Sequence, residues 1–180
     1  MVCWDVGANV GFYTLLFAEL VGSTGRVFAF EPLDRNVDRL RQHVKINGYS
    51  NVQIFPSALG NFVGEVAFDP GPGASMGHVA AAGSINVPCT TPDTLIAACE
   101  AEPPDVIKID VEGAEVDVLR GARQLLKSRP AIFLATHGTF AHRQSIELLL
   151  ASGYEVSALD GGLPDHTDEL VALPPGGFRS

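Results

Sequence analysis

Residues 3–11 have the sequence C-W-D-V-G-A-N-V-G and are followed by an apolar, helix-like run that ends at Val21. The pattern predicts a short buried strand, a glycine turn and a helix, which together open a parallel α/β sheet. Gly7 and Gly11 let the backbone turn sharply and approach a ligand without a Cβ in the way. Unpaired N–H groups at the start of the helix favour an anionic group, and Asp5 can accept hydrogen bonds from an ammonium or hydroxyl group. We therefore expect a ligand site at this turn.

The spacing of the glycines distinguishes two kinds of cofactor site. A dinucleotide site has the pattern G-x-G-x-x-G, whereas this turn has G-x-x-x-G with Asp5 in front of it. The turn instead resembles motif I of S-adenosylmethionine-dependent methyltransferases. That resemblance implies that Asp5 contacts the amino-acid end of the cofactor. An ordinary strand-to-helix turn without a ligand is the alternative for this stretch taken alone.

The composition indicates one soluble globular domain over residues 1–180, of which 46% are hydrophobic. The net charge is −9 with only 12 Lys and Arg residues, and an acidic surface disfavours nucleic acid as a partner. The three scattered cysteines favour neither a disulfide framework nor a zinc site. No basic leader precedes the first strand, and no apolar run is long enough to span a bilayer, so we expect a cytoplasmic protein that does not bind membranes.

Strand-like and helix-like segments alternate along the chain, which predicts an α/β fold with a mostly parallel sheet and helices on both faces. Residues 59–68 look like a hairpin. Residues 69–83 look like a mobile loop whose Met76 and His78 could touch a substrate, and a solvated linker is the alternative for this stretch. Residues 114–127 predict one helix with a buried apolar stripe. Beyond the opening strand, we expect strands at 26–30, 52–55, 85–88, 106–110, 131–135, 154–158 and 170–173, and further helices at 36–47, 91–101 and 143–151.

A second acid, Glu31, ends the strand at residues 26–30. An acid at this position can receive both hydroxyl groups of a ribose, as in dinucleotide folds. Pro32 and Leu33 would then lie beside the base, and Ser57 and Ala58 would form the other side of an adenine slot. An acid stabilised by a helix N-terminus is the alternative for Glu31 alone.

The block K-I-D-V-E-G-A-E at residues 108–115 follows the strand at 106–110. Together with D-V-G-A-N-V-G and F-E-P, this block resembles the FkbM family of methyltransferases, from Cys3 to about His137. The resemblance implies a Rossmann-like class I methyltransferase fold with strand order 3-2-1-4-5-7-6 and an antiparallel C-terminal strand. It also implies S-adenosyl-L-methionine as cofactor and O-methylation of sugar or natural-product hydroxyls. The candidate cofactor-binding residues are Asp5, Gly7, Ala8, Asn9, Gly11, Tyr13, Glu31, Pro32, Leu33, Ser57, Ala58 and Asp110.

Relatives in that family usually carry helices before motif I that cover the cofactor. The first predicted strand begins at Met1, so we expect the acceptor side to be minimal, to be supplied by a partner chain such as a second copy in a homo-oligomer, or to be missing from the given sequence.

An alcohol is a poor nucleophile near neutral pH, so a base within hydrogen-bond reach accelerates its methylation. His137 and Glu112 are the candidate bases, and Asp110 is the candidate for positioning cofactor or acceptor. These three residues could instead hold a divalent cation, although we assign no metal. Lys108 is expected to pair with a carboxylate.

The sequence bears on three other functions. A nicotinamide oxidoreductase is disfavoured by the glycine spacing and by the lack of a Tyr followed four residues later by Lys. An amino-group methyltransferase would carry N/D-P-P-Y where this chain has D-V-E-G. A non-catalytic or partner-dependent cofactor-binding module of the same fold is the remaining alternative.

Overall fold

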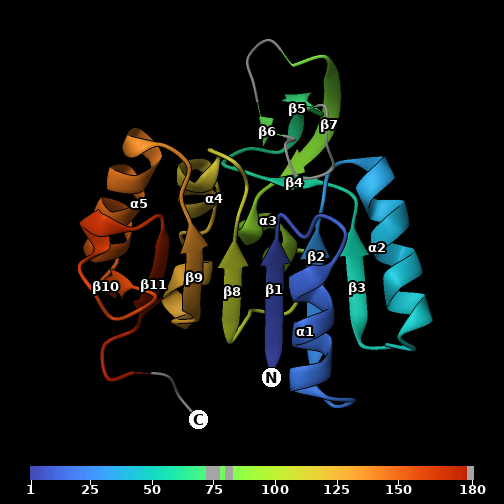
Figure 1. Ribbon diagram of the computed structural model, residues 1–180, viewed down its shortest axis with the longest axis horizontal. Helices are drawn as coiled ribbons and strands as arrows, with labels where there is room; N and C mark the ends of the chain where they lie inside the picture. The colour runs from blue at the N-terminus through green and yellow to red at the C-terminus, as the bar shows by residue number, and fades with distance from the viewer. Residues whose placement is uncertain (72–77, 80–82, 178–180) are drawn as a thin grey trace.

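A seven-stranded sheet forms the centre of the fold (Figure 1). The computed structural model describes residues 1–71, 78–79 and 83–177, and the strand order is β10-β11-β9-β8-β1-β2-β3. All neighbouring strands are parallel except β11, which is antiparallel to β9 and β10. This order confirms the predicted Rossmann-like methyltransferase fold with its antiparallel C-terminal strand. The bounds are Val2–Val6 for β1, Arg26–Phe30 for β2, Val52–Phe55 for β3, Val106–Ile109 for β8, Ala131–Ala135 for β9, Glu155–Ala158 for β10 and Glu169–Leu173 for β11.

Helices cover both faces of the sheet, as right-handed crossovers in opposite directions require. On one face Ala18 of α1 packs against Val27. On the other face Leu119 of α4 and Leu149 of α5 join the core around Trp4. Within the described residues, no helix combines the length and apolar character needed to cross a membrane. The helices are α1 (Phe12–Val21), α2 (Asp34–Ile46), α3 (Pro92–Ala97), α4 (Glu115–Gly121) and α5 (Thr139–Ala151), with 3₁₀ turns η1 (Leu125–Ser128) and η2 (Pro164–His166).

A second sheet stands at the carboxyl ends of the parallel strands (Figure 1) and has the order β4-β7-β5-β6. The hairpin predicted over residues 59–68 is wrong, because β7 lies between β4 and β5 and pairs with both. Phe68 and Val87 of this sheet pack with Leu33 and Ala58 in a separate small core. The strands are β4 (Ala58–Leu59), β5 (Gly64–Asp69), β6 (His78–Val79) and β7 (Ile85–Thr90).

The loop predicted over residues 69–83 lies largely outside the described residues, and so does Met76. Its mobility and its contact with a substrate therefore stay predictions. Within this range His78–Val79 form β6 and pair with β5, so the expectation of a stretch without secondary structure is corrected there.

The helix predicted over residues 114–127 is divided into α4 and η1. The interruption has a long-range cause: the Asp93 carboxylate of α3 accepts backbone N–H groups of Gln124 and Leu125 at 2.9–3.0 Å. These bonds begin a new helical turn at η1 rather than continuing α4. The predicted apolar stripe is nevertheless confirmed, because Val118, Leu119, Ala122, Leu125 and Leu126 are all buried in the main core.

Candidate functional site

The turn after β1 has a backbone conformation that favours glycine. Gly7 has φ +84°, and a Cβ at this position would lie 1.9 Å from the backbone oxygen of Asp110. Gly11 has φ +102°, and its Cβ would lie 2.4 Å from a side-chain carbon of α2. The N–H groups of Gly7 and Ala8 donate to the carbonyl oxygen of Phe30 at 3.0 and 2.9 Å. The turn is therefore fixed between the end of β2 and the end of β8.

Gly7→Ala is expected to lower the free energy of unfolding by roughly 2–4 kcal/mol, because it adds a backbone clash to an unfavourable φ. Gly48→Ala is the matched control, since Gly48 has φ +71° but open space around its would-be Cβ. Urea unfolding of the control should show a loss of only about 1 kcal/mol. Equal losses in the two variants would show that the close approach to Asp110 does not constrain the turn.

A cavity of about 400 Å³ lies where β1, β2 and β8 end. Glu112, which was predicted to be catalytic, lines this cavity. Three other predicted site residues, Asp5, Gly11 and His137, are not among its lining residues. Phe12, Asn36 and Phe68 line the cavity too and were not predicted. The predicted cofactor-binding residues found in its lining are Gly7, Ala8, Asn9, Tyr13, Glu31, Pro32, Leu33, Ser57, Ala58 and Asp110.

Position in the chain explains why these three residues were missed. Phe12 and Asn36 lie in the first turns of α1 and α2, next to predicted loop residues, so proximity to the turns could have suggested them. Phe68 lies in β5 of the second sheet. No local pattern indicated that this sheet packs over the cavity.

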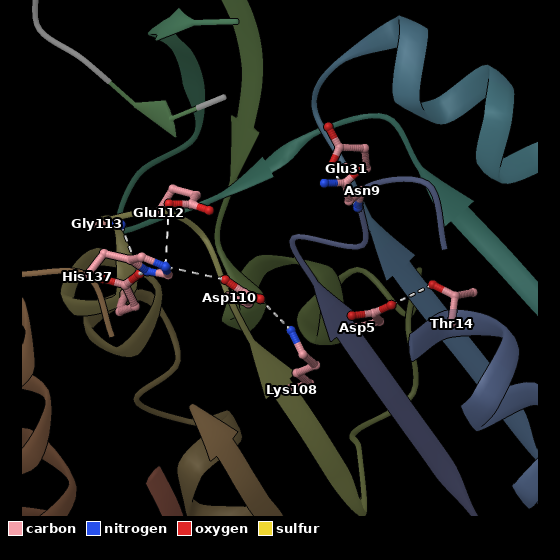
Figure 2. A network of polar contacts seen from close by, with 10 residues as sticks. Asp5, Asn9, Thr14, Glu31, Lys108, Asp110, Glu112, Gly113 and His137 are labelled. Carbon is pink, nitrogen blue, oxygen red and sulfur yellow. Dashed lines mark hydrogen bonds and ion pairs between the residues drawn. The ribbon is translucent and has the colours of Figure 1, made fainter. Parts of the chain in front are cut away.

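Glu31 links the two loops at the carboxyl ends of β1 and β2 (Figure 2). Its Oε2 accepts the backbone N–H of Asn9 at 2.9 Å, and its Oε1 accepts the backbone N–H of Leu33 at 2.9 Å. Asn36 Nδ2 donates to the same Oε1 at 3.3 Å. Burial raises the pKa of Glu31, against the opposing effect of these hydrogen bonds. Glu31 thus shapes the cavity wall, and its contact with a ribose stays a prediction.

Asp5 lies beneath the cavity lining, with a residue exposure of 1%. Its Oδ2 accepts the hydroxyl group of Thr14 in α1 at 2.6 Å (Figure 2). Its Oδ1 is buried and has no hydrogen-bond partner among the described residues. Burial raises the pKa of Asp5. A buried carboxylate oxygen without a partner is costly, but Asp5 is not among the residues that line the cavity, so its predicted contact with the cofactor stays a prediction.

A polar cluster joins the ends of β8 and β9 (Figure 2). Lys108 Nζ lies 2.9 Å from Asp110 Oδ2, which confirms the predicted pairing of this lysine with a carboxylate. His137 Nε2 lies 3.4 Å from Glu112 Oε2 and 3.8 Å from Asp110 Oδ1. The structure therefore brings together all three residues predicted to be catalytic. Their ligand atoms lie within 4.8 Å of one another, a spacing that could also hold a metal ion.

Glu115 belongs to the same cluster and was not predicted. It is fully buried, and its Oε1 accepts the backbone N–H of Gly113 at 2.8 Å and His137 Nδ1–H at 2.9 Å. Donation from Nδ1 leaves Nε2 of the neutral imidazole to accept a proton. Glu115 closes the K-I-D-V-E-G-A-E block and begins α4, where an acid is usually explained by the helix dipole. The sequence alone does not distinguish such an acid from one that contacts another residue, so the hydrogen bond between Glu115 and His137 was not predicted.

Charges around His137 set its protonation. Burial lowers its pKa, but the hydrogen bond to Glu115 and the charges of Glu112, Glu115 and Asp110 outweigh burial, so the pKa is raised overall. Protonation of His137 therefore stabilises the folded state. This contribution is complete below the ordinary pKa of about 6.5 and is lost as the pH rises through the raised value.

Glu115→Gln is expected to lower the pKa of His137, because the amide keeps the hydrogen-bonding shape but removes one negative charge. An NMR titration of the histidine ring protons, assigned with His137→Asn, measures the change. Glu147→Gln removes an exposed charge from α5, where Glu147 accepts a hydrogen bond from Gln144, and should leave the His137 titration unchanged. An unshifted titration in Glu115→Gln would contradict the proposed orientation of the imidazole.

The chain is similar in sequence to known methyltransferases. Residues 5–167 match the family described as methyltransferase FkbM domain. The chain is 31% identical over 150 residues to the hexuronic acid methyltransferase AglP of Haloferax volcanii, covering 82% of this chain and 61% of that protein. The chain thus spans about three-fifths of the length of this curated relative.

Solved structures show the same fold. Methyltransferase FkbM from Methylobacillus flagellatus KT has a TM-score of 0.66 and 20% identity, over 95% of this chain and 42% of that one. Aeropyrum pernix fibrillarin, solved with natively bound S-adenosyl-L-methionine, has a TM-score of 0.59 and 16% identity, over 95% of this chain and 65% of that one.

Proposed function

The chain belongs to the FkbM methyltransferase family, and we propose that it transfers a methyl group from S-adenosyl-L-methionine to a hydroxyl group of a sugar. The observation that carries this proposal is the convergence of two groups of residues at one sheet edge. A cavity lined by the glycine turn and Glu31 adjoins the cluster of Asp110, Glu112 and His137. One group suits a nucleoside, and the other suits a reacting hydroxyl.

The cavity residues fit the cofactor in charge and shape. Its nucleoside would lie between Pro32 and Ala58, with Glu31 on the ribose. The cofactor supplies a methyl group on a positively charged sulfur. Carboxylates near the cavity favour that positive charge. Holding an acceptor in line with the methyl group could supply about 7–11 kcal/mol of the rate acceleration by positioning.

The acceptor hydroxyl needs a base, and the cluster offers two. Glu112 lines the cavity, so its carboxylate can receive the proton directly. His137 lies at 3.4 Å from Glu112 and can take the proton at Nε2, because Glu115 engages Nδ1. Glu112 has φ +53° and is followed by Gly113 at φ +103°. This unusual turn projects the carboxylate at the end of β8, consistent with the backbone strain found at functional sites.

A sugar acceptor is supported by the curated relative, which is named a hexuronic acid methyltransferase. Phe12 and Tyr13 line the cavity and are 74% and 41% exposed. Aromatic rings with one open face offer an apolar surface next to polar groups, which suits the mixed character of a sugar ring.

Isothermal titration calorimetry with S-adenosylhomocysteine and with NAD tests the cofactor. Heat of binding is expected from S-adenosylhomocysteine and none from NAD. Incubation with radiolabelled S-adenosylmethionine and a panel of methyl glycosides then tests methyl transfer. Binding of NAD alone would reject the cofactor assignment. Binding of S-adenosylhomocysteine without transfer to any glycoside would reject the sugar acceptor.

A further inference from the structure

Lys108 in β8 is a buried cation that lines the cavity. Every other Lys or Arg in the described part of the chain is exposed. A buried charge is costly unless it is paired, so an ammonium group at this position calls for a role beyond solubility. In the sheet register Lys108 lies between Asp5 of β1 and Phe133 of β9. Its side chain therefore leaves the same face of the sheet as the Asp5 carboxylate.

Two groups hold the ammonium group of Lys108 at the end of β8. Its Nζ lies 2.9 Å from Asp110 Oδ2, as Figure 2 shows. The same atom lies 4.4 Å from the centre of the Tyr13 ring, a distance at which a cation is attracted to an aromatic face. Tyr13 belongs to the first turn of α1 and also lines the cavity. The protein itself thus fixes the ammonium group between a carboxylate and a ring.

Asp110 connects the cavity to His137. It lines the cavity, whereas His137 does not, and its Oδ1 lies 3.8 Å from His137 Nε2. The other oxygen, Oδ2, is the one that pairs with Lys108. The Asp110 side chain is 34% exposed, so without this ion pair it would be free to turn toward solvent. Because Lys108 holds one oxygen, the other is directed at the imidazole.

Lys108 also offsets the charge of Asp110. The charged groups that face His137 are the carboxylates of Asp110 and Glu112, which follow β8, and of Glu115 in α4. A carboxylate that is paired with an ammonium group holds a proton on a nearby imidazole less strongly than an unpaired one does. The pair therefore keeps Asp110 beside His137 without adding its full charge to those of the two glutamates.

We infer that Lys108 is a positioning residue for methyl transfer: by pairing with Asp110 Oδ2 it directs Asp110 Oδ1 to His137 and keeps Nε2 of the imidazole able to accept the proton of the acceptor hydroxyl. The inference rests on the proposed function and adds a residue to it. Lys108 acts on the base through Asp110 and exchanges no atom with the acceptor.

Lys108→Met tests the inference, because it removes the ammonium group and keeps an unbranched side chain. An NMR titration of the His137 ring, without cofactor or acceptor and with EDTA in the buffer, should have its midpoint raised by roughly 0.5–1 pH unit, since the Asp110 charge is no longer offset. For a methyl glycoside that the unmodified protein methylates, kcat should fall about tenfold near neutral pH and KM should stay within about threefold. Lys127→Met is the matched control and should change neither, because it removes an exposed lysine of η1 that donates to Gln124.

A second background shows whether Lys108 acts through Asp110. In Asp110→Asn protein the change Lys108→Met should shift the His137 titration much less and should reduce kcat little further, because residues in contact that act as a unit have non-additive effects. The double variant leaves neither partner of the ion pair unmatched, so it is expected to fold even where Lys108→Met alone does not.

Equal shifts of the titration in the two backgrounds would overturn the inference, because Lys108 would then act without Asp110. An unshifted titration in both backgrounds would overturn it as well. Where Lys108→Met alone does not fold, the double variant is compared with Asp110→Asn directly, and a clear difference in titration or in kcat between these two would have the same consequence. The proposed function fails separately, if the unmodified protein transfers no methyl group to any glycoside, and the titration does not depend on that result.

Discussion

His137→Asn is expected to lower kcat for methyl transfer by about 10²–10⁴-fold, the usual contribution of a general base. The affinity for S-adenosylhomocysteine should stay within about twofold, because His137 does not line the cavity. Asparagine retains a polar side chain near Glu115, whose buried Oε1 would otherwise lose one of its two hydrogen bonds. Steady-state kinetics with radiolabelled cofactor measures kcat, and calorimetry measures the affinity.

The second base candidate makes this prediction sharper. Glu112→Gln alone should lower kcat by a similar factor if the carboxylate and the imidazole move one proton as a pair. The double variant should then lower kcat little more than either single variant does. Additive losses would mean that the two groups act separately. A loss below about tenfold in both single variants would remove the cluster from the chemistry.

The pH dependence gives an independent readout of the same pair. A base must be unprotonated, and the carboxylates raise the pKa of His137. Activity of the unmodified protein should therefore rise with pH through a value above the ordinary histidine pKa of about 6.5. In His137→Asn this rise should disappear. A profile that is flat from neutral to alkaline pH in the unmodified protein would exclude His137 as the base.

Periodicity along the chain predicted the individual strands of the main sheet, because buried parallel strands are continuous apolar runs with recognisable ends. Their order in the sheet was implied by the resemblance to the FkbM family. The second sheet was not predictable in the same way. Gly60, Asn61 and Gly64 are turn residues and suggested a local hairpin, but β5 pairs with the more distant β7, with Gly64 opposite Cys89 and Phe68 opposite Ile85. Local turn chemistry reports where a strand ends, whereas pairing is decided by packing such as that of Phe68 with Val87.

The candidate site could likewise be predicted from the sequence only in part. Residues at the carboxyl ends of strands were predicted together because parallel strands bring those ends to one edge. Burial was harder to predict. Asp5 was predicted to contact a ligand and Glu115 was not predicted in the site at all, but both are almost fully buried. A one-dimensional pattern contains no measure of how deeply packing encloses a side chain.

Glu31→Gln is expected to weaken the binding of S-adenosylhomocysteine by about 100-fold, since hydrogen bonds to a charged group contribute about 1.5–3 kcal/mol each. The carboxylate accepts backbone N–H groups on both of its oxygens, from Asn9 and Leu33. A glutamine amide can offer an acceptor to one of them and must present a donor to the other. The variant therefore both removes the proposed ribose acceptor and loosens the two loops. Asp34→Asn is the control, because it removes an exposed charge three residues away.

A ligand change separates these two effects. If Glu31 accepts the ribose hydroxyls, 5′-methylthioadenosine should bind the unmodified protein more tightly than its 2′-deoxy analogue, by roughly tenfold for one charge-assisted hydrogen bond. In Glu31→Gln that difference should largely vanish, because the partner of the hydroxyl is gone. If Glu31 only ties the loops together, both ligands should weaken equally and the difference should persist. Equal discrimination in the two proteins would therefore remove Glu31 from the cofactor contacts and leave it a purely structural link between β1 and β2.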